Sequence, residues 1–183
     1  MDLPTRQDFA VMELLYSGAG RRLDGLMESV FQRVKDKYSD HSLLNWNKEN
    51  KGRDRRSCAY WGAAICWSWV IINQNPYQYF FWGIQFPEYD SEWGTTEIFP
   101  KNGSYPQLVF GYSTTEEKYT KQALDAFLTK GYTVGERTDV ESTIFLQSLP
   151  ISQLLESNYN IDTITDWLSE ELDKALTVIT DMR

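Results

Sequence analysis

The sequence predicts an α+β fold, in which a mostly antiparallel sheet carries helices packed mainly on one face. Three observations lead to this prediction. Apolar residues recur at helical spacing near both ends of the chain, apolar residues alternate in its middle, and short turn-rich connections join the alternating segments. Runs of strands bracketed by helices are typical of this class. The expected order is α-α-ββββ-α-ββ-α, and 183 residues suffice for a single domain spanning residues 1–183.

Two helices open the chain. Residues 4–16 predict the first, because Pro4 suits a first turn and apolar residues follow at helical spacing. A glycine-containing break at residues 17–20 separates it from a second helix at about 20–38. The apolar stripe of this second helix comprises Leu23, Leu26, Met27, Val30, Phe31, Val34 and Tyr38. Residues 39–57 are polar and rich in turn residues, so we expect a loop there.

An aromatic-rich sheet is expected to follow. Residues 60–93 contain twelve aromatic side chains, and alternation predicts strands within residues 58–72 and 80–86. A helix over residues 59–70 remains an alternative, because a short apolar run does not settle the period. Two more strands, at 95–99 and 107–112, are joined by a hairpin connection at 101–104. Consecutive strands with tight connections indicate an antiparallel meander of about four strands.

The C-terminal part alternates helix and strand. A helix at about 115–130 is expected to be capped by Thr114 or Thr115 and to end at Gly131. Residues 132–136 and 142–148 predict one or two further strands, and residues 154–159 a short helical turn. The last helix is expected at about 162–180, with Thr163 and Asp166 resembling a capping box at its start.

Charge divides the chain unevenly. The helical N-terminal portion, residues 1–57, holds 11 Lys+Arg and 9 Asp+Glu, whereas the aromatic-rich portion, residues 58–183, holds 7 and 17. The acidic portion opposes binding to a phosphate backbone and favours a basic partner. Basic residues gather only in a loop at 47–57, so any contact with nucleic acid is expected through this loop alone. Its basic side chains are Lys48, Lys51, Arg53, Arg55 and Arg56.

Cysteine and histidine are scarce. Cys58 and Cys66 are eight residues apart, a spacing that fits no zinc signature, and His41 is the single imidazole. We therefore expect free thiols in a reducing, cytoplasmic compartment, and no metal or cofactor. The N-terminus lacks the features of a signal peptide, and no apolar run is long enough to span a membrane.

No motif predicts a catalytic residue. The weak anion-binding candidates are Gly20, Arg21 and Arg22, which stand at the predicted start of the second helix. The order of strands and helices also resembles the restriction-nuclease-like fold, in which an Asp precedes a Glu-x-Lys on the next strand. Asp90 and Glu97 could match that pattern, but Phe99 stands where the family has lysine. The resemblance therefore implies at most a degenerate nuclease.

Aromatic side chains fall on both faces of the predicted strands. Because a sheet with helices on one side needs only one apolar face, the surplus predicts a partner or dimer surface on the other. The expected interface residues are Trp93, Tyr89, Tyr79 and Phe81. Trp93 and Tyr89 flank a polar turn, which favours their exposure.

These features together predict a non-enzymatic, acidic protein-binding module. Its most concrete form is a small inhibitor or regulator of a larger nucleic-acid-handling complex, of the anti-defence kind found in phages and other mobile elements, such as an anti-CRISPR-like protein. Acidic surfaces can occupy the basic channel of such a complex. Two alternatives stay open. The order of elements resembles class I secretion chaperones, which implies an acidic dimer that binds an unfolded client; the other alternative is the degenerate nuclease-like domain.

Overall fold

The computed structural model describes residues 18–46, 64–73, 75–85, 107–137, 142–150 and 161–182. Within these residues lie three helices and six strands, in an order that confirms the α+β class. The elements are α2 (Gly18–Lys37), β1 (Leu44–Asn45), β2 (Ala64–Ile72), β3 (Asn75–Gln85), β4 (Gln107–Thr114), α3 (Glu117–Thr129), β5 (Thr133–Arg137), β6 (Ser142–Pro150) and α5 (Ile161–Asp181). The helix expected at 4–16, the strand at 95–99, the hairpin connection at 101–104 and the turn at 154–159 lie outside the described residues.

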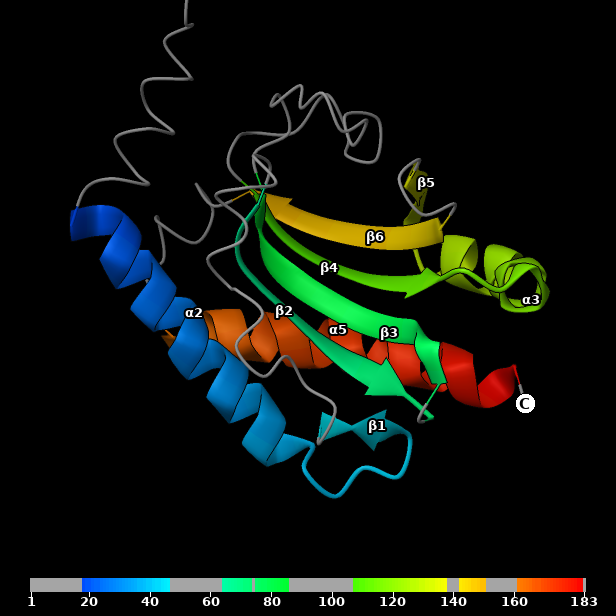
Figure 1. Ribbon diagram of the computed structural model, residues 1–183, viewed down its shortest axis with the longest axis horizontal. Helices are drawn as coiled ribbons and strands as arrows, with labels where there is room; N and C mark the ends of the chain where they lie inside the picture. The colour runs from blue at the N-terminus through cyan, green and yellow to red at the C-terminus, as the bar shows by residue number, and fades with distance from the viewer. Residues whose placement is uncertain are drawn as a thin grey trace, which may run out of the picture.

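The strands form one sheet in the order β1-β2-β3-β4-β6-β5, with every neighbouring pair antiparallel (Figure 1). Segment 64–72 is therefore a strand, which resolves the alternative of a helix there. β3 pairs directly with β4, with Ile84 opposite Leu108. A strand at 95–99 consequently cannot stand between them, and the predicted meander order is wrong at that point. β5 and β6 form an antiparallel pair in which β6, the later strand in the chain, lies next to β4, and β5 lies at the edge of the sheet.

One strand was not expected from the sequence. Leu44 and Asn45, in the segment predicted as a polar loop, pair with Ile72 and Ile71 at the edge of β2. Leu43 and Leu44 are buried, and the Trp46 indole donates a hydrogen bond to the Tyr38 carbonyl oxygen at 2.9 Å. The two buried leucines and the Trp46 hydrogen bond hold the segment after α2 against the edge of the sheet.

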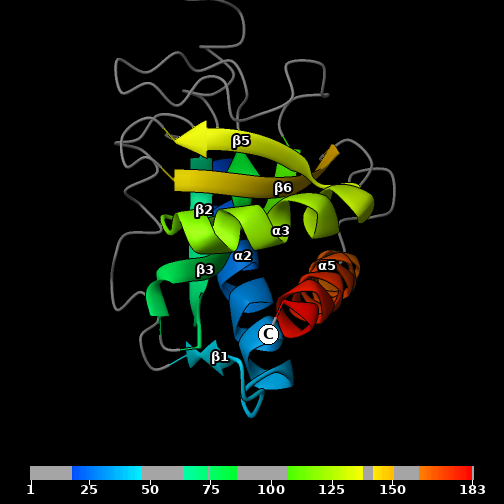
Figure 2. The same cartoon turned by 90° about the vertical axis from the view of Figure 1, so that its right-hand side faces the viewer.

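The main core lies between one face of the sheet and all three helices (Figures 1 and 2). Alternate residues of β3 and β4 point into it. Phe31 of α2 stacks on Trp82 at a ring-centroid distance of 6.0 Å, and Phe127 of α3 stacks on Tyr112 at 5.0 Å. The inward residues of α5 are Ile164, Leu168, Leu172, Ala175, Leu176, Val178 and Ile179. The prediction of helices mainly on one face is confirmed.

Helix starts differ from the expected capping. Residues 18–20, where the sequence predicts a break, are already helical in α2. The cap of α3 is Glu116, which makes no side-chain capping bond; the Thr114 hydroxyl instead accepts a hydrogen bond from the Glu116 amide at 3.1 Å. α5 begins at Ile161, so Thr163 lies inside the first turn and is not the first residue of a capping box. The predicted end of α3 is confirmed, because Gly131 adopts a φ of +83° that favours glycine.

Candidate protein-binding surfaces

The outward face of α5 carries a row of carboxylates. At about 100° of rotation per residue, the acidic residues on this face fall within an arc of roughly 100°, opposite the buried stripe. All of them are exposed. We call this set the acidic stripe; it comprises Asp162, Asp166, Glu170, Asp173 and Asp181. With Glu171 and Lys174 included, α5 has six acidic residues and one basic residue, a net charge of −5 within a chain of net −8.

A tyrosine from the end of α2 fixes one side of this helix. The buried Tyr38 hydroxyl lies 2.8 Å from Asp173 Oδ1 and 3.1 Å from the Ser169 carbonyl oxygen, which both accept from it. Burial, and then the bond to Asp173, raise the pKa of the Tyr38 phenol above its usual range. Arg33 of α2 forms an ion pair with Asp162, near the first turn of α5, at the other end of the contact between these two helices. These contacts orient two members of the acidic stripe.

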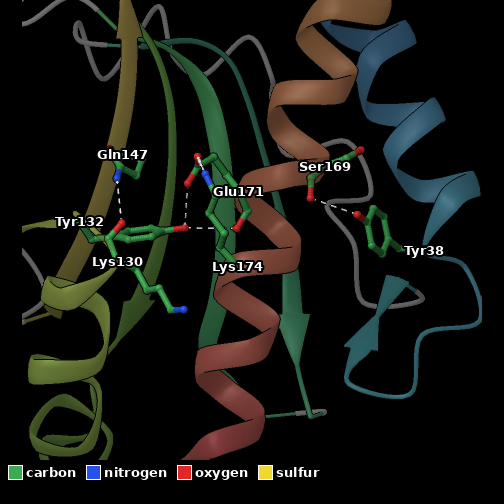
Figure 3. A network of polar contacts seen from close by, with 7 residues as sticks. All are labelled: Tyr38, Lys130, Tyr132, Gln147, Ser169, Glu171 and Lys174. Atoms are coloured by element: carbon green, nitrogen blue, oxygen red, sulfur yellow. Dashed lines mark hydrogen bonds and ion pairs between the residues drawn. The ribbon is translucent and has the colours of Figure 1, made fainter.

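A second tyrosine holds the opposite side of α5, as Figure 3 shows. The buried Tyr132 hydroxyl lies 3.2 Å from the Glu171 carbonyl oxygen and 3.3 Å from Glu171 Oε2. Lys174 completes the group, with Nζ 2.7 Å from Glu171 Oε1. Burial, followed by the neighbouring carboxylate, raises the pKa of the Tyr132 phenol. The Glu171 side chain is only 6% exposed, so this carboxylate belongs to the interior and not to the acidic stripe.

The turn that carries Tyr132 is itself fixed. Gly131 reverses the chain after α3, and the Gln147 side-chain amide donates to the Lys130 carbonyl oxygen at 3.4 Å. The Tyr132 amide donates to the Phe127 carbonyl oxygen at 3.1 Å. Thus α5 is bonded through Tyr38 to α2 and through Tyr132 to the α3–β5 turn. The acidic stripe stands on a helix that is anchored on both flanks.

The face of the sheet opposite the helices holds a smaller apolar cluster. Phe81, Val109 and Leu146 are buried there, and the half-buried Trp69 and Tyr79 pack against them. The Phe81 ring occupies the space above Gly111, where a Cβ would also come within 2.8 Å of Leu146 Cδ2. Glycine at position 111 therefore leaves the space that the Phe81 ring fills. Of the two predicted interface residues on this face, Phe81 contributes packing, and Tyr79 retains part of its surface.

Several predicted site residues cannot be placed. Trp93, Tyr89 and the whole basic loop, with Lys48, Lys51, Arg53, Arg55 and Arg56, lie outside the described residues, as do the nuclease-like pair Asp90 and Glu97. The anion-site candidates belong to the first turns of α2. Gly20 is inside the helix and not in a turn before it, and the side chains of Arg21 and Arg22 are outside the described part.

Histidine and metal ligands give no further site in the described part of the chain. His41 is half-buried in the turn after α2, where Nδ1 accepts a bond from the Leu43 amide at 3.3 Å. Among the described residues, no three His, Cys, Asp or Glu side chains come together in a way that could hold a metal ion. None of the described helices has the length and apolar character needed to cross a membrane.

Sequence reasoning missed a second exposed surface, which lies on α3 and β5. Leu124, Leu128 and Val134 are 41%, 46% and 42% exposed. Helical spacing could have shown that Leu124 and Leu128 share a flank distinct from that of the buried Ala123 and Phe127. The strand order, which leaves β5 at an edge, was not readable from the chain.

Comparisons with protein-family models, with curated proteins and with solved structures find no match to this chain. The geometry of the surfaces described above is therefore the basis for assigning a function.

Proposed function

We propose that this protein is a non-enzymatic, acidic binding module that inhibits or regulates a larger nucleic-acid-handling complex by placing α5 against its basic surface. The observation that carries the proposal is the acidic stripe of α5. The first four carboxylates, from Asp162 to Asp173, are three or four residues apart, which is about one helical turn or 5.4 Å along the axis. Asp181 follows about two turns further on. Surfaces that bind nucleic acid are rich in Lys and Arg, which would accept such a row in place of phosphates.

Asp162 in the first turn suits the helix dipole, but the rest of the acidic pattern of α5 works against the stability of the isolated helix. Carboxylates one turn apart repel one another, and a carboxylate in the last turn opposes the helix dipole, at a cost of about 0.3–1 kcal/mol. Asp181 ends α5, and its last turn contains no basic residue. A helix selected for stability alone would carry lysine there. A partner that supplies positive charge gives a reason for retaining the acidic residues.

Anchoring of α5 suits it to recognition. Tyr38 and Tyr132 bond to opposite sides of the helix, and Tyr38 also fixes the Asp173 carboxylate. A surface that is already ordered loses less conformational entropy when it binds. We further propose that the protein acts in the cytoplasm, where Cys58 and Cys66 would remain reduced thiols.

The test starts with identification of the partner by affinity capture and mass spectrometry. The wild-type chain is compared with an α5 variant that carries Asp166→Asn, Glu170→Gln and Asp181→Asn, which changes the net charge from −8 to −5. We expect wild type to capture a basic nucleic-acid-binding protein, and DNA or RNA to compete with the capture. The α5 variant should recover much less of that protein.

A matched variant controls for net charge alone. Glu28→Gln, Asp36→Asn and Asp40→Asn remove three exposed carboxylates from α2 and the turn after it and give the same net charge of −5. This control should capture the partner as wild type does. Equal loss of capture in both variants would show that overall net charge, and not the position of the carboxylates on α5, causes the loss. Undiminished capture by the α5 variant would refute the role of the acidic stripe.

A further inference from the structure

The exposed apolar side chains of α3 and β5 lie next to a sheet edge. β5 pairs with β6 on one side, and no strand of the described residues lies on its other side. Val134 is opposite the fully buried Phe145 and thus points to the helix side of the sheet, yet it remains 42% exposed. An edge strand with an exposed valine is a template for pairing with another strand.

Two leucines of α3 extend this edge. In Figure 2, α3 lies between α5 on one flank and β5 on the other, and α3 contacts both elements. Ala126 packs against the main core, and Leu124 and Leu128 lie on the opposite flank, roughly 160–200° away at 100° per residue. The leucines therefore border the same edge as Val134. We call Leu124, Leu128, Val134 and the edge of β5 the α3–β5 surface.

The charge of this surface permits contact between identical copies. The exposed charged residues of α3 and its C-terminal turn are Glu117, Lys118, Lys121, Asp125 and Lys130, three positive and two negative. Glu117 and Lys121 already form an ion pair at 2.6 Å. In contrast, two copies facing each other through α5 would oppose two helices of net charge −5. Like charges in register are strongly unfavourable, so self-association is electrostatically permitted at the α3–β5 surface and disfavoured at α5.

We infer that the protein forms a symmetric dimer through the α3–β5 surface, in which β5 pairs antiparallel with β5 of a second copy. Gly135 is the central residue of β5, so a two-fold axis near it would pair the two strands symmetrically along their whole length. The two sheets would then be continuous, and the leucines of each α3 would cover the exposed valine of the other copy. Each dimer would present two acidic stripes away from the interface, which strengthens binding to a repetitive basic partner.

The test is the oligomeric state of the purified full chain by sedimentation velocity at micromolar concentrations. Wild type should sediment as a dimer. A Leu124→Gln/Leu128→Gln variant, which leaves the net charge unchanged, should weaken the dimer roughly tenfold or more, because two apolar side chains lose their cover. Val134→Glu should do the same, because pairing centred on Gly135 places residue 134 opposite Glu136 of the second copy. Tyr77→Gln is the control: Tyr77 is 57% exposed but lies on β3, so its loss should leave the dimer intact.

Hydrogen exchange gives a second readout that does not depend on the variants folding. Amides of β5 should become more protected as the wild-type concentration rises, whereas those of α5 should not change. A wild-type chain that stays monomeric throughout this concentration range, or a dimer unaffected by all three interface substitutions, would overturn the inference. Binding of a foreign peptide to β5 of a monomer would assign the edge to a partner and equally overturn it. The α5 variant should dimerise like wild type, so this result is independent of the proposed function.

Discussion

Replacing Tyr132 with phenylalanine tests the anchoring of α5 most specifically. The substitution removes one hydroxyl and keeps the ring, which packs against Phe127 at a centroid distance of 5.0 Å. The lost hydroxyl lies 3.2 Å and 3.3 Å from two oxygens of Glu171. A hydrogen bond to a charged group contributes about 1.5–3 kcal/mol, and a neutral one about 0.5–1.5 kcal/mol. Because both distances are long for a hydroxyl donor and Lys174 still pairs with the carboxylate, we expect a loss of about 1–2 kcal/mol.

Urea unfolding followed by circular dichroism measures this loss. For a chain of this length, a loss of about 1–2 kcal/mol corresponds to a fall in Tm of roughly 2–8 °C. Tyr77→Phe is the matched control, because Tyr77 is largely exposed, and it should change stability by less than about 0.5 kcal/mol. Glu171→Gln should couple to Tyr132→Phe, so the double variant should lose less than the sum of the single losses. A stability for Tyr132→Phe equal to wild type, or strict additivity with Glu171→Gln, would show that this contact does not anchor the helix.

Three further predictions address packing, pH and catalysis. Gly111→Ala should destabilise the protein by about 1–3 kcal/mol, because its Cβ would lie 2.8 Å from both Leu146 Cδ2 and the Phe145 carbonyl oxygen. Gly25→Ala, in open space on a helix, should stabilise it by up to about 1 kcal/mol. Chemical denaturation of both variants checks these opposite signs. Burial raises the pKa of Tyr112 and Tyr132, so the unfolded chain loses these protons at lower pH than the folded chain does. The free energy of unfolding should therefore fall above about pH 10, by about 1.4 kcal/mol per pH unit for each tyrosine. An unfolding midpoint that does not change with pH in this range would contradict this prediction. Purified protein with Mg²⁺ or Mn²⁺ should not cleave DNA or RNA, and metal-dependent cleavage that Glu97→Gln abolishes would favour the nuclease alternative instead.

Local patterns accounted for most of the described elements. The apolar stripes of α2 and α5 and the alternation in β3 predicted those elements closely, because burial on one face imposes the period of the element on the sequence. β1 was missed because two residues are too short for a period, and Leu44 is held by pairing with Ile72, which is distant in the chain. The insertion of β6 between β4 and β5 is also a long-range choice that no local pattern encodes.

The candidate surfaces were less predictable than the fold. The acidic bias was evident from composition, but its concentration on one face of α5 follows from which residues the core buries. Aromatic residues on both sheet faces predicted an interface on the outer face, which stays a prediction. The structure shows a small apolar cluster there, in which Phe81 is buried because Gly111 provides room for its ring, a cross-strand relation that depends on register. The bonds of Tyr38 and Tyr132 to α5 join residues more than thirty positions apart, and nothing in the local sequence marks them.

The most direct test of the central claim is the affinity of the captured partner for wild type and for the two triple variants, measured by titration calorimetry at low and at physiological salt. Exposed ion pairs contribute about 0.2–1 kcal/mol each, so loss of three from the acidic stripe should weaken binding roughly 3- to 150-fold. The salt dependence should also become shallower. The matched control, with substitutions at Glu28, Asp36 and Asp40, should bind within a few-fold of wild type. Equal affinities for the two triple variants would contradict the assignment of α5 as the binding surface.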